Sequence, residues 1–395
     1  MKKNLLTILT FCLCLPLLAQ TDTLVVDSLP WPQRLQAKID SILATPLLQT
    51  TQLGLMVYDL TADSTLYTYG HRQRLRPAST MKLLTAITAL DQLGGDYQLK
   101  TSLYYTGTVS GGTLRGNLHC VGGMDPMFDR TDMLSFVNKV RHLGIDTICG
   151  SIVVDLSFKD DDRLGEGWCW DDDNAVLTPL LYDGKDCFVE QFARELRRDG
   201  VVMVDTTVHV PMSSRRHVTS RSHGVDEVLV RMMKESDNLY AESLFYQLSG
   251  AGSTKSATGK LSAGQVRRMI QKLGLQPGDY RVADGSGLSL YNYVSAELEV
   301  QMLRYAYQHS NIYRQLFPAL PVAGVDGTLK SRMRKTPAEG NVHAKTGSVS
   351  GISSLAGYCL AANGHRLCFA IINQGVSRMS DGRNMQDELC TAFCE

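Results

Sequence analysis

The stretch that decides the fold opens a long apolar run and reads Pro77-Ala78-Ser79-Thr80-Met81-Lys82-Leu83-Leu84-Thr85-Ala86-Ile87-Thr88-Ala89-Leu90. Proline suits the first turn of a helix, because its fixed φ matches the helix and its missing N–H costs nothing there. The residues that follow leave almost no polar face, and such a helix belongs inside a domain. The sequence therefore predicts a buried helix that begins close to Ser79 and carries Lys82.

Ser79 and Lys82 are three positions apart, so on a helix they share one face within hydrogen-bonding reach. A serine hydroxyl needs a neighbour that accepts its proton, and an amine among apolar groups is pushed toward its neutral, proton-accepting form. The pair predicts a nucleophile beside its base. The alternative is a chance match, because Ser-x-x-Lys arises about once in a few hundred residues.

A second polar element, Ser236-Asp237-Asn238, lies between helical patterns at 225–234 and 239–248. From one turn, the Ser236 hydroxyl could relay a proton while the Asn238 amide holds a substrate amide. The competing explanation is helix capping, which Ser, Asp and Asn all favour.

A third element, Lys345-Thr346-Gly347-Ser348, opens a predicted strand. A cation and hydroxyls there would bind a carboxylate, and Gly347 would let a substrate approach the backbone. The alternative is an ordinary charged strand at the edge of a sheet.

In this order the three elements are the signature of penicillin-recognising serine enzymes. The triplets Ser-Asp-Asn and Lys-Thr-Gly each arise by chance about once in several thousand residues, so the ordered set outweighs the three separate alternatives. The chain further resembles the family of penicillin-binding protein 4, the S13-type D-alanyl-D-alanine carboxypeptidases. The resemblance spans nearly the whole mature chain and is carried by residues 76–82, 122–126, 168–172, 178–179, 236–242, 284–289, 320–329 and 344–348.

The resemblance implies an α+β fold, with a β-lactamase/transpeptidase-like antiparallel sheet flanked by helices and an inserted second α/β domain. It implies that Ser79 attacks the terminal D-Ala-D-Ala bond of a peptidoglycan stem peptide, with Lys82 accepting the proton, and forms an acyl-enzyme. Peptide crosslinks are a further expected substrate, and β-lactams are expected to bind covalently.

The same resemblance gives each remaining residue a role. Ser236 would relay a proton to the leaving amine, Asn238 would hold Lys82 and the substrate amide, and Lys345 would support the relay. Thr346, Gly347 and Ser348 would form the substrate-binding strand, with the two hydroxyls on the terminal carboxylate. The oxyanion would lie between the backbone N–H groups of Ser79 and Ser348. No metal or cofactor is expected.

The domain organisation follows from where strand and helix patterns lie. Predicted strands at 53–60, 65–69, 343–348, 352–361 and 366–373 could share one antiparallel sheet. We expect a catalytic domain at 21–92 and 225–395, interrupted by an inserted domain at 93–224. Within the insert, residues 148–156 would form one strand and residues 213–224 a return linker. Family members commonly carry two nested insertions, and we expect that the second is missing here, near 183–186.

The first residues resemble a secretory signal, with Lys2 and Lys3 before an apolar run and a small residue at Ala19. Cleavage near Ala19 or Gln20 would give a periplasmic protein; an uncleaved anchor is the alternative. The forty basic and forty acidic residues balance, so no field exists to attract nucleic acid. Nothing implies a stable protein partner.

Eight cysteines follow the signal, and two of them flank a hairpin signal, Asn363-Gly364. Counting outward from a two-residue turn places Cys359 opposite Cys368, which predicts a disulfide; two buried thiols are the alternative. No cysteine spacing resembles a zinc site. His119, His343 and His365 are expected to be structural.

Two questions about the site stay open at the sequence level. A serine β-lactamase shares the three motifs, but no Glu-x-x-Leu-Asn segment follows Ser236-Asp237-Asn238. A non-catalytic sensor of wall fragments or drugs is the rival from another class. Asp125 and Trp168 could line the cleft or stabilise the insert, and packing is favoured because tryptophan is usually packed.

Overall fold

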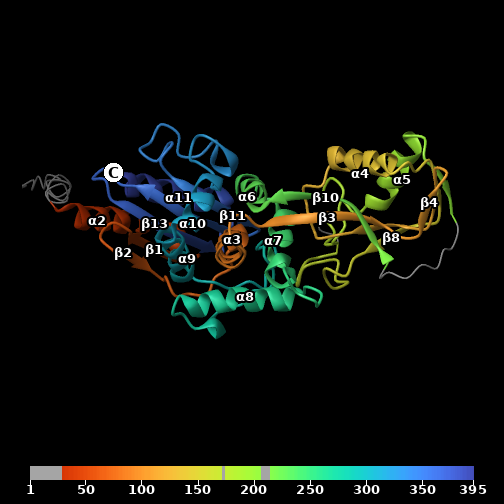
Figure 1. The fold of residues 1–395 in the computed structure, drawn as a ribbon. Coiled ribbons are helices and arrows are strands. Elements are labelled where there is room, and N and C mark those ends of the chain that lie inside the picture. Colours follow the sequence, from red (N-terminus) through yellow and green to blue (C-terminus); the bar gives the residue numbers. More distant parts are fainter. Residues whose placement is uncertain (1–28, 171–173, 206–213) are drawn as a thin grey trace, which may run out of the picture.

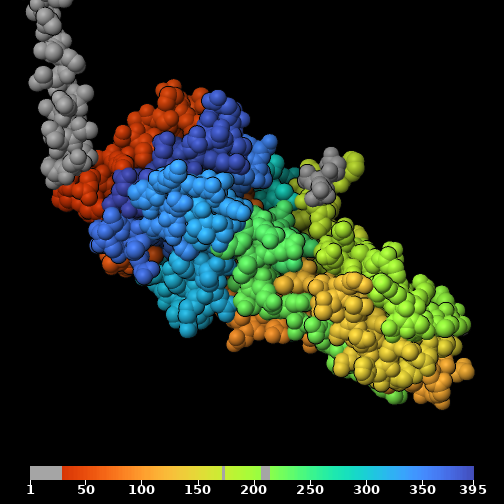
Figure 2. Space-filling view, turned by 90° about the horizontal axis from the view of Figure 1, so that it is seen from above, coloured from red at the N-terminus to blue at the C-terminus, as the bar shows by residue number. Residues whose placement is uncertain are grey.

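The structure is a computed structural model, and it describes residues 29–170, 174–205 and 214–395. The predicted signal segment therefore lies outside the described residues. Within them, no helix is both long enough and apolar enough to cross a membrane. The molecule is elongated, with the residues between about 98 and 224 at one end and the segment that begins at residue 29, together with the C-terminus, at the other (Figures 1 and 2).

The centre of the larger end is a five-stranded antiparallel sheet with the order β11-β12-β13-β1-β2. The first part of the chain supplies two of its strands and the last part supplies three, as the sequence predicts. The strands are β1 (Gln52–Asp59), β2 (Ser64–Tyr69), β11 (His343–Val349), β12 (Ile352–Leu360) and β13 (Arg366–Gln374).

Helices cover both faces of this sheet, which gives it two separate apolar cores (Figure 1). Along β13, Phe369 and Ile371 face one core while Ala370 and Ile372 face the other, as strand geometry requires. The helices on the first side are α2 (Trp31–Leu43) and α11 (Met379–Cys394). Those on the other side are α3 (Met81–Leu93), α6 (Val225–Lys234), α7 (Asn238–Gly250), α8 (Gly259–Lys272), α9 (Ala296–Gln308) and α10 (Ser310–Ala319).

The segment between α3 and α6 carries two further sheets. One has the order β10-β3-β6-β8, with β3 (Gln98–Tyr105), β6 (Leu118–Val121), β8 (Ile152–Asp155) and β10 (Arg216–Gly224). The other has the order β4-β5-β7-β9, with β4 (Thr108–Ser110), β5 (Thr113–Arg115), β7 (Thr147–Cys149) and β9 (Val202–Val204). They share a core with α4 (Arg130–His142) and α5 (Phe188–Arg198), including an aromatic cluster centred on Phe136 and Phe188. The domain boundaries given above stay predictions.

Two expectations are wrong here. The expected linker at 213–224 contains strand β10, which pairs with β3 from Arg216↔Tyr105 to Gly224↔Gln98. Its residues are polar because β10 lies at the edge of its sheet, so apolar alternation could not reveal it. The single strand expected at 148–156 is two strands, β7 and β8, in different sheets.

The predicted Cys359–Cys368 disulfide is also wrong, because the hairpin has a different loop. Ala361 N donates to His365 O, so three residues form the loop, and Gly364 takes the positive φ (85°) that closes it. The register therefore shifts by one, pairing Cys359 with Leu367 and Tyr358 with Cys368. A shift of one residue moves a side chain to the other face, and the two buried thiols lie in different cores.

We predict that Phe369→Ala lowers the free energy of unfolding by about 3–5 kcal/mol, because it empties a fully buried site. The Phe369 ring lies 5.3 Å from that of Phe393, so it joins the sheet to α11. Urea denaturation measures the change. Leu360→Ala, in the same sheet but 44% exposed, should stay within about 0.5 kcal/mol of wild type. Equal losses in the two variants would contradict this account of the core.

Candidate active site

Ser79 lies in a strained turn just before α3. A 3₁₀ turn (Ala78–Thr80) leads into the helix, and Ala78 has a φ of 49°, a conformation that costs about 1–3 kcal/mol for a residue other than glycine. Two contacts hold the turn. Thr80 Oγ1 donates to Pro77 O over 2.8 Å, and Gly287 approaches so closely that a Cβ there would lie 1.8 Å from Ala78 O. The turn thereby presents Ser79 to the cleft.

Lys82 is fully buried, and its amine has three polar neighbours. Nζ lies 3.0 Å from Ser79 Oγ, 2.7 Å from Asn238 Oδ1 and 2.8 Å from the carbonyl oxygen of Ser286. Burial lowers the pKa of Lys82 to about 8, against the opposing charges of Asp284, Glu242 and Asp237. About one-tenth of the Lys82 side chains are therefore neutral at pH 7, and a neutral amine can accept a proton from Ser79.

In the Ser-Asp-Asn element, one residue caps a helix and the other two face the cleft or Lys82. Asp237 caps α7, accepting from Tyr240 N over 3.3 Å, and its second oxygen pairs with Arg231. Asn238 turns toward Lys82, while Ser236, at a φ of 61°, faces the cleft and accepts from Lys345 Nζ over 2.9 Å. The sequence offered helix capping and a functional site as alternatives. In the structure both occur: Asp237 caps the helix, and Ser236 and Asn238 belong to the site.

Lys345 is the second fully buried lysine of the site. Its Nζ also donates to Thr346 O over 2.7 Å, and burial together with the charge of Lys82 lowers its pKa well below the usual value. Thr346 Oγ1 donates to Thr328 Oγ1 over 2.7 Å. A Cβ at Gly347 would lie 2.6 Å from Pro77 O and 3.0 Å from Ser79 N, so only glycine lets β11 lie this close to the nucleophile.

These elements meet at one open cavity of about 590 Å³. Ser79, Ser236, Thr346 and Ser348 line it, while Lys82, Asn238 and Lys345 reach it through the hydrogen bonds above. The structure thus brings together all eight residues singled out in the sequence. The remaining lining residues are Thr328, Ser331, Arg332, Ser380, Arg383, Asn384 and Asp387.

Three of these lining residues have charged side chains. Arg332 is bound to Asp387, with a shortest distance of 2.6 Å, so its charge is balanced. Arg383 is exposed on α11 and adds positive charge to the cavity wall. An anionic group of a ligand would therefore find hydroxyls and a cation in this cavity.

Two contributors had no role in the sequence analysis. Ser286 contributes only its backbone carbonyl, which leaves no signature in a side-chain pattern. Thr328 fixes the Thr346 hydroxyl from a different segment. Both lie in stretches that carry the family resemblance, at 284–289 and 320–329. Their place in these stretches is the one feature of the sequence that could have pointed to them.

Asp125 and Trp168 do not line this cavity. Asp125 is fully buried and contacts His223, with Oδ2 2.7 Å from Nδ1, while its other oxygen accepts from Met127 N. Trp168 Nε1 donates to Asp284 Oδ2 over 2.8 Å. Their contacts support the packing role favoured above. Within the described residues, no group of three His, Cys, Asp or Glu side chains could hold a metal ion.

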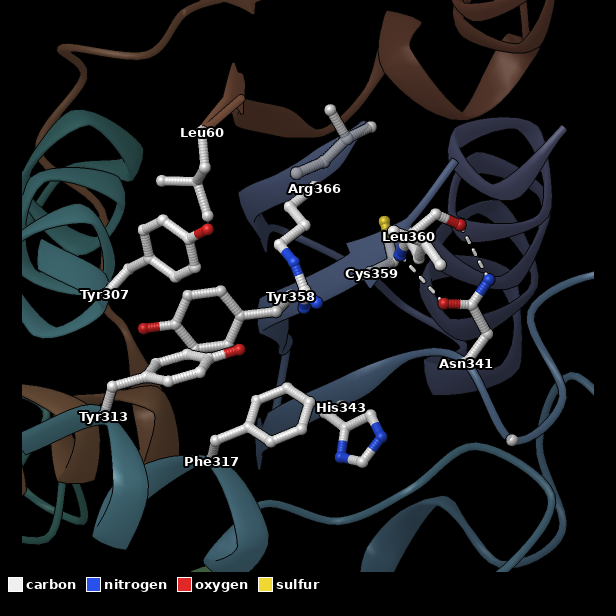
Figure 3. Close-up of a pocket in the computed structure, with 12 residues that line it drawn as sticks. Leu60, Tyr307, Tyr313, Phe317, Asn341, His343, Tyr358, Cys359, Leu360 and Arg366 are labelled. Atoms are coloured by element: carbon white, nitrogen blue, oxygen red, sulfur yellow. Dashed lines mark hydrogen bonds between the residues drawn. The ribbon is translucent and has the colours of Figure 1, made fainter. Parts of the chain in front are cut away.

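A separate, smaller cavity of about 200 Å³ lies near the start of β11 and has aromatic walls (Figure 3). Tyr307, Tyr313 and Phe317 line it, and the Phe317 ring stacks on His343 with centroids 4.1 Å apart. Burial lowers the pKa of His343, which suits a packed neutral ring. Neither lysine of the site reaches this cavity, so it plays no part in the arrangement around Ser79.

Comparison with known proteins identifies relatives over nearly the whole chain. The model of the D-Ala-D-Ala carboxypeptidase 3 (S13) family matches residues 35–181 and 178–393. The two matches meet close to residues 183–186, where the sequence suggested a lost insertion. D-alanyl-D-alanine carboxypeptidase DacB of Haemophilus influenzae is 26% identical over 85% of this chain and 88% of its own length.

Solved structures agree in fold. The crystal structure of penicillin-binding protein 4 (dacB) from Haemophilus influenzae superposes with a TM-score of 0.75 at 23% identity, covering 92% of this chain and all of that one. The penicillin G-acylated Bd3459 predatory endopeptidase from Bdellovibrio bacteriovorus, in complex with immunity protein Bd3460, gives 0.56 at 19%, covering 85% and 91%. The α+β fold class expected from the sequence is confirmed.

We predict that Gly347→Ala destabilises the protein by about 1–3 kcal/mol, because the new methyl group would overlap Ser354 Oγ and the backbone of Pro77. The matched control is Gly264→Ala in α8, where a Cβ meets nothing within 4 Å. That change should stabilise by up to about 1 kcal/mol through helix propensity. Denaturant unfolding of both variants measures this, and a neutral Gly347→Ala would show that β11 is free to move away from Ser79.

Proposed function

The chain belongs to the D-Ala-D-Ala carboxypeptidase 3 (S13) family, which makes it a D-Ala-D-Ala carboxypeptidase, and we propose that Ser79 is the nucleophile of its reaction. The observation that carries this proposal is the position of Lys82 Nζ, 3.0 Å from Ser79 Oγ and fully buried. The substrate is a peptidoglycan stem peptide that ends in D-Ala-D-Ala. β-Lactams react at the same serine.

In the first step Ser79 Oγ attacks the carbonyl carbon of the penultimate D-alanine as neutral Lys82 takes its proton. The backbone N–H groups of Ser79 and Ser348 bind the oxyanion, an arrangement worth about 3 kcal/mol per donor. The C–N bond then breaks: Ser236 gives its hydroxyl proton to the leaving amine and takes in its place the proton that Lys82 accepted, so that Lys82 is neutral again. Lys345 supports this transfer through its hydrogen bond to Ser236.

The second step hydrolyses the ester. Water attacks the acyl carbon, the C–Oγ bond breaks, and Ser79 recovers its proton. Neutral Lys82 is again the group within reach of Ser79 Oγ, so it serves as base and then as acid. Asn238 orients the Lys82 amine during both steps and holds the substrate amide.

The terminal carboxylate of the substrate binds along β11. The hydroxyls of Thr346 and Ser348 donate to it. Thr346 Oγ1 donates to Thr328 Oγ1 in the structure, so on substrate binding the Thr346 proton turns to the carboxylate and its oxygen accepts from Thr328 instead. Gly347 leaves room for the peptide backbone beside the strand. The exposed cation Arg383 adds a favourable field for an anionic substrate.

The alternative is a serine β-lactamase, which must hydrolyse its acyl-enzyme quickly. Of the described residues that line the cavity, Asp387 is the one carboxylate, and Arg332 binds it. A carboxylate free to activate the deacylating water is therefore absent from this described lining, which favours the peptidase. Fast turnover of a chromogenic cephalosporin would favour the β-lactamase instead. A sensor would trap penicillin without releasing D-alanine from a stem peptide.

We place the reaction in the periplasm, where crosslinked peptidoglycan lies, on the strength of the signal-like residues 1–20. We also propose one discontinuous catalytic domain at 21–92 and 225–395 and an inserted domain at 93–224. The shared sheet of β1, β2 and β11–β13 supports the first part of this division.

We predict that purified crosslinked peptidoglycan, treated with the protein, yields free D-alanine, and that Ser79→Ala reduces the yield by at least about a thousandfold. Loss of dimeric muropeptides in the same digest would add endopeptidase activity, as in the Bdellovibrio neighbour's name. A fluorescent penicillin should label the wild type and not the variant. Unimpaired D-alanine release by Ser79→Ala would overturn the proposal.

We predict that acylation by penicillin accelerates as the pH rises toward about 8. The pKa of Lys82 is lowered to about 8, so the amine is about one-tenth neutral at pH 7 and about half neutral at pH 8. The rate should level off above that range, and a pH profile of the acylation rate constant measures the midpoint. A rate constant that stays flat across this range would mean that Lys82 does not accept the proton.

A further inference from the structure

A buried carboxylate lies behind the Lys82 amine, and the reaction above does not use it. Glu242 is one helical turn after Asn238 on α7, so the two side chains share a face. It is 1% exposed. A carboxylate in such a place is costly unless its oxygens are bonded and its charge has a purpose, so each contact of Glu242 needs an explanation.

The contacts of Glu242 reach Lys82 through one short backbone segment. Glu242 Oε1 accepts from Gly285 N over 3.0 Å and from Ser286 N over 2.8 Å. The carbonyl of the same Ser286 accepts from Lys82 Nζ over 2.8 Å. One peptide segment therefore links the carboxylate on α7 to the amine on α3.

The segment is fixed from its other side as well. Thr85, one turn after Lys82, donates its hydroxyl to Gly285 O over 2.7 Å. Asp284 accepts from Gly287 N over 2.8 Å and from Ser289 N over 2.7 Å. The Ser286 carbonyl thus has little freedom, and Glu242 is the group that anchors it to α7.

From this geometry we propose that Glu242 is a positioning residue, which holds the Ser286 carbonyl against Lys82 and, once ionised, places a negative charge behind the amine. The proposal rests on the proposed function, because it concerns the base of that reaction. Glu242 touches no reacting atom. It acts on the reaction through Lys82.

Several charged groups face this pair. Asp284 and Asp237 act on Lys82 together with Glu242, and Lys345 lies close enough for the two amines to repel. Burial and the charge of Asp284 raise the pKa of Glu242 to about 8, so this carboxyl becomes charged over the same pH range in which Lys82 loses its proton. A cavity of about 400 Å³ reaches Glu242 and Asp284 and shares no lining residue with the cleft. Its other charged lining residues are Asp160, Asp162, Glu166 and Lys260.

The test is the pH profile of acylation by a fluorescent penicillin for the full chain and its variants. Glu242→Gln keeps Oε1, which can still accept both N–H groups, and removes the charge. The ionised carboxylate raises the pKa of Lys82 and is about half formed at pH 8, so its removal should move the midpoint to lower pH by up to about one unit. Glu242→Asp keeps an ionisable carboxyl, but its side chain is one methylene shorter and its oxygens lie farther from the N–H groups of Gly285 and Ser286. It should lower the plateau rate severalfold and leave the midpoint in place.

The matched control is Glu299→Gln. Glu299 is also fully buried, and burial raises its pKa to about 8, but its partner is Thr80 and its charge is not among those acting on Lys82. This variant should keep the wild-type midpoint, whatever its rate. A midpoint shift in Glu242→Gln alone, with a reduced plateau in Glu242→Asp, supports the proposal.

Other outcomes overturn it. A Glu242→Gln protein whose rate falls equally at every pH, or whose midpoint matches wild type, refutes the electrostatic part. If that variant does not fold, a wild-type plateau in Glu242→Asp refutes the positioning part. Absence of acylation in the wild type overturns the proposed function and this proposal with it, whereas normal wild-type acylation with an unmoved midpoint overturns only the role of Glu242.

Discussion

The site depends on one buried amine. Moving an ammonium group out of water is costly, and Lys82 has no exposed surface. Three acceptors from three distant parts of the chain offset that cost: the hydroxyl of Ser79, the amide of Asn238 and the carbonyl of Ser286. Each acceptor is also a constraint, because α3, α7 and the loop at 284–287 must meet at one atom. The same burial that demands these bonds makes the amine a usable base.

The second buried amine, Lys345, imposes the matching constraint from the sheet. It joins β11 to Ser236, and Gly347 brings the same strand against the backbone of Ser79. Because each lysine lies in the field of the other, protonation of one disfavours protonation of its neighbour. The nucleophile is therefore enclosed between a helix and a strand that are each held by a buried lysine. The burial of these two lysines therefore determines both how the elements pack and how the amines can react.

Sequence reasoning found the parts of this arrangement that have side-chain signatures. Ser79, Lys82, Asn238 and Lys345 were identified because their residue types and spacing are rare in combination. Ser286 could not be found in that way, since a carbonyl is common to every residue. Strand β10 was missed because an edge strand shows no apolar alternation, and the Cys359–Cys368 pairing failed on one extra loop residue. Such details are decided by backbone geometry in the folded state.

The remaining question is how Ser79 and Asn238 stay close when the chain between them builds two further sheets. The answer lies in strands β3 and β10, which follow α3 and precede α6. They pair antiparallel from Gln98↔Gly224 outward, so the segment leaves and returns about 5 Å apart. Val225 N also donates to Tyr97 O, which closes the base of this ribbon. Because its ends are pinned together, the intervening chain can be long or short without moving α3 relative to α6 and α7. An insertion lost near 183–186 would be tolerated for the same reason, since that segment lies far along the chain from both pinned ends.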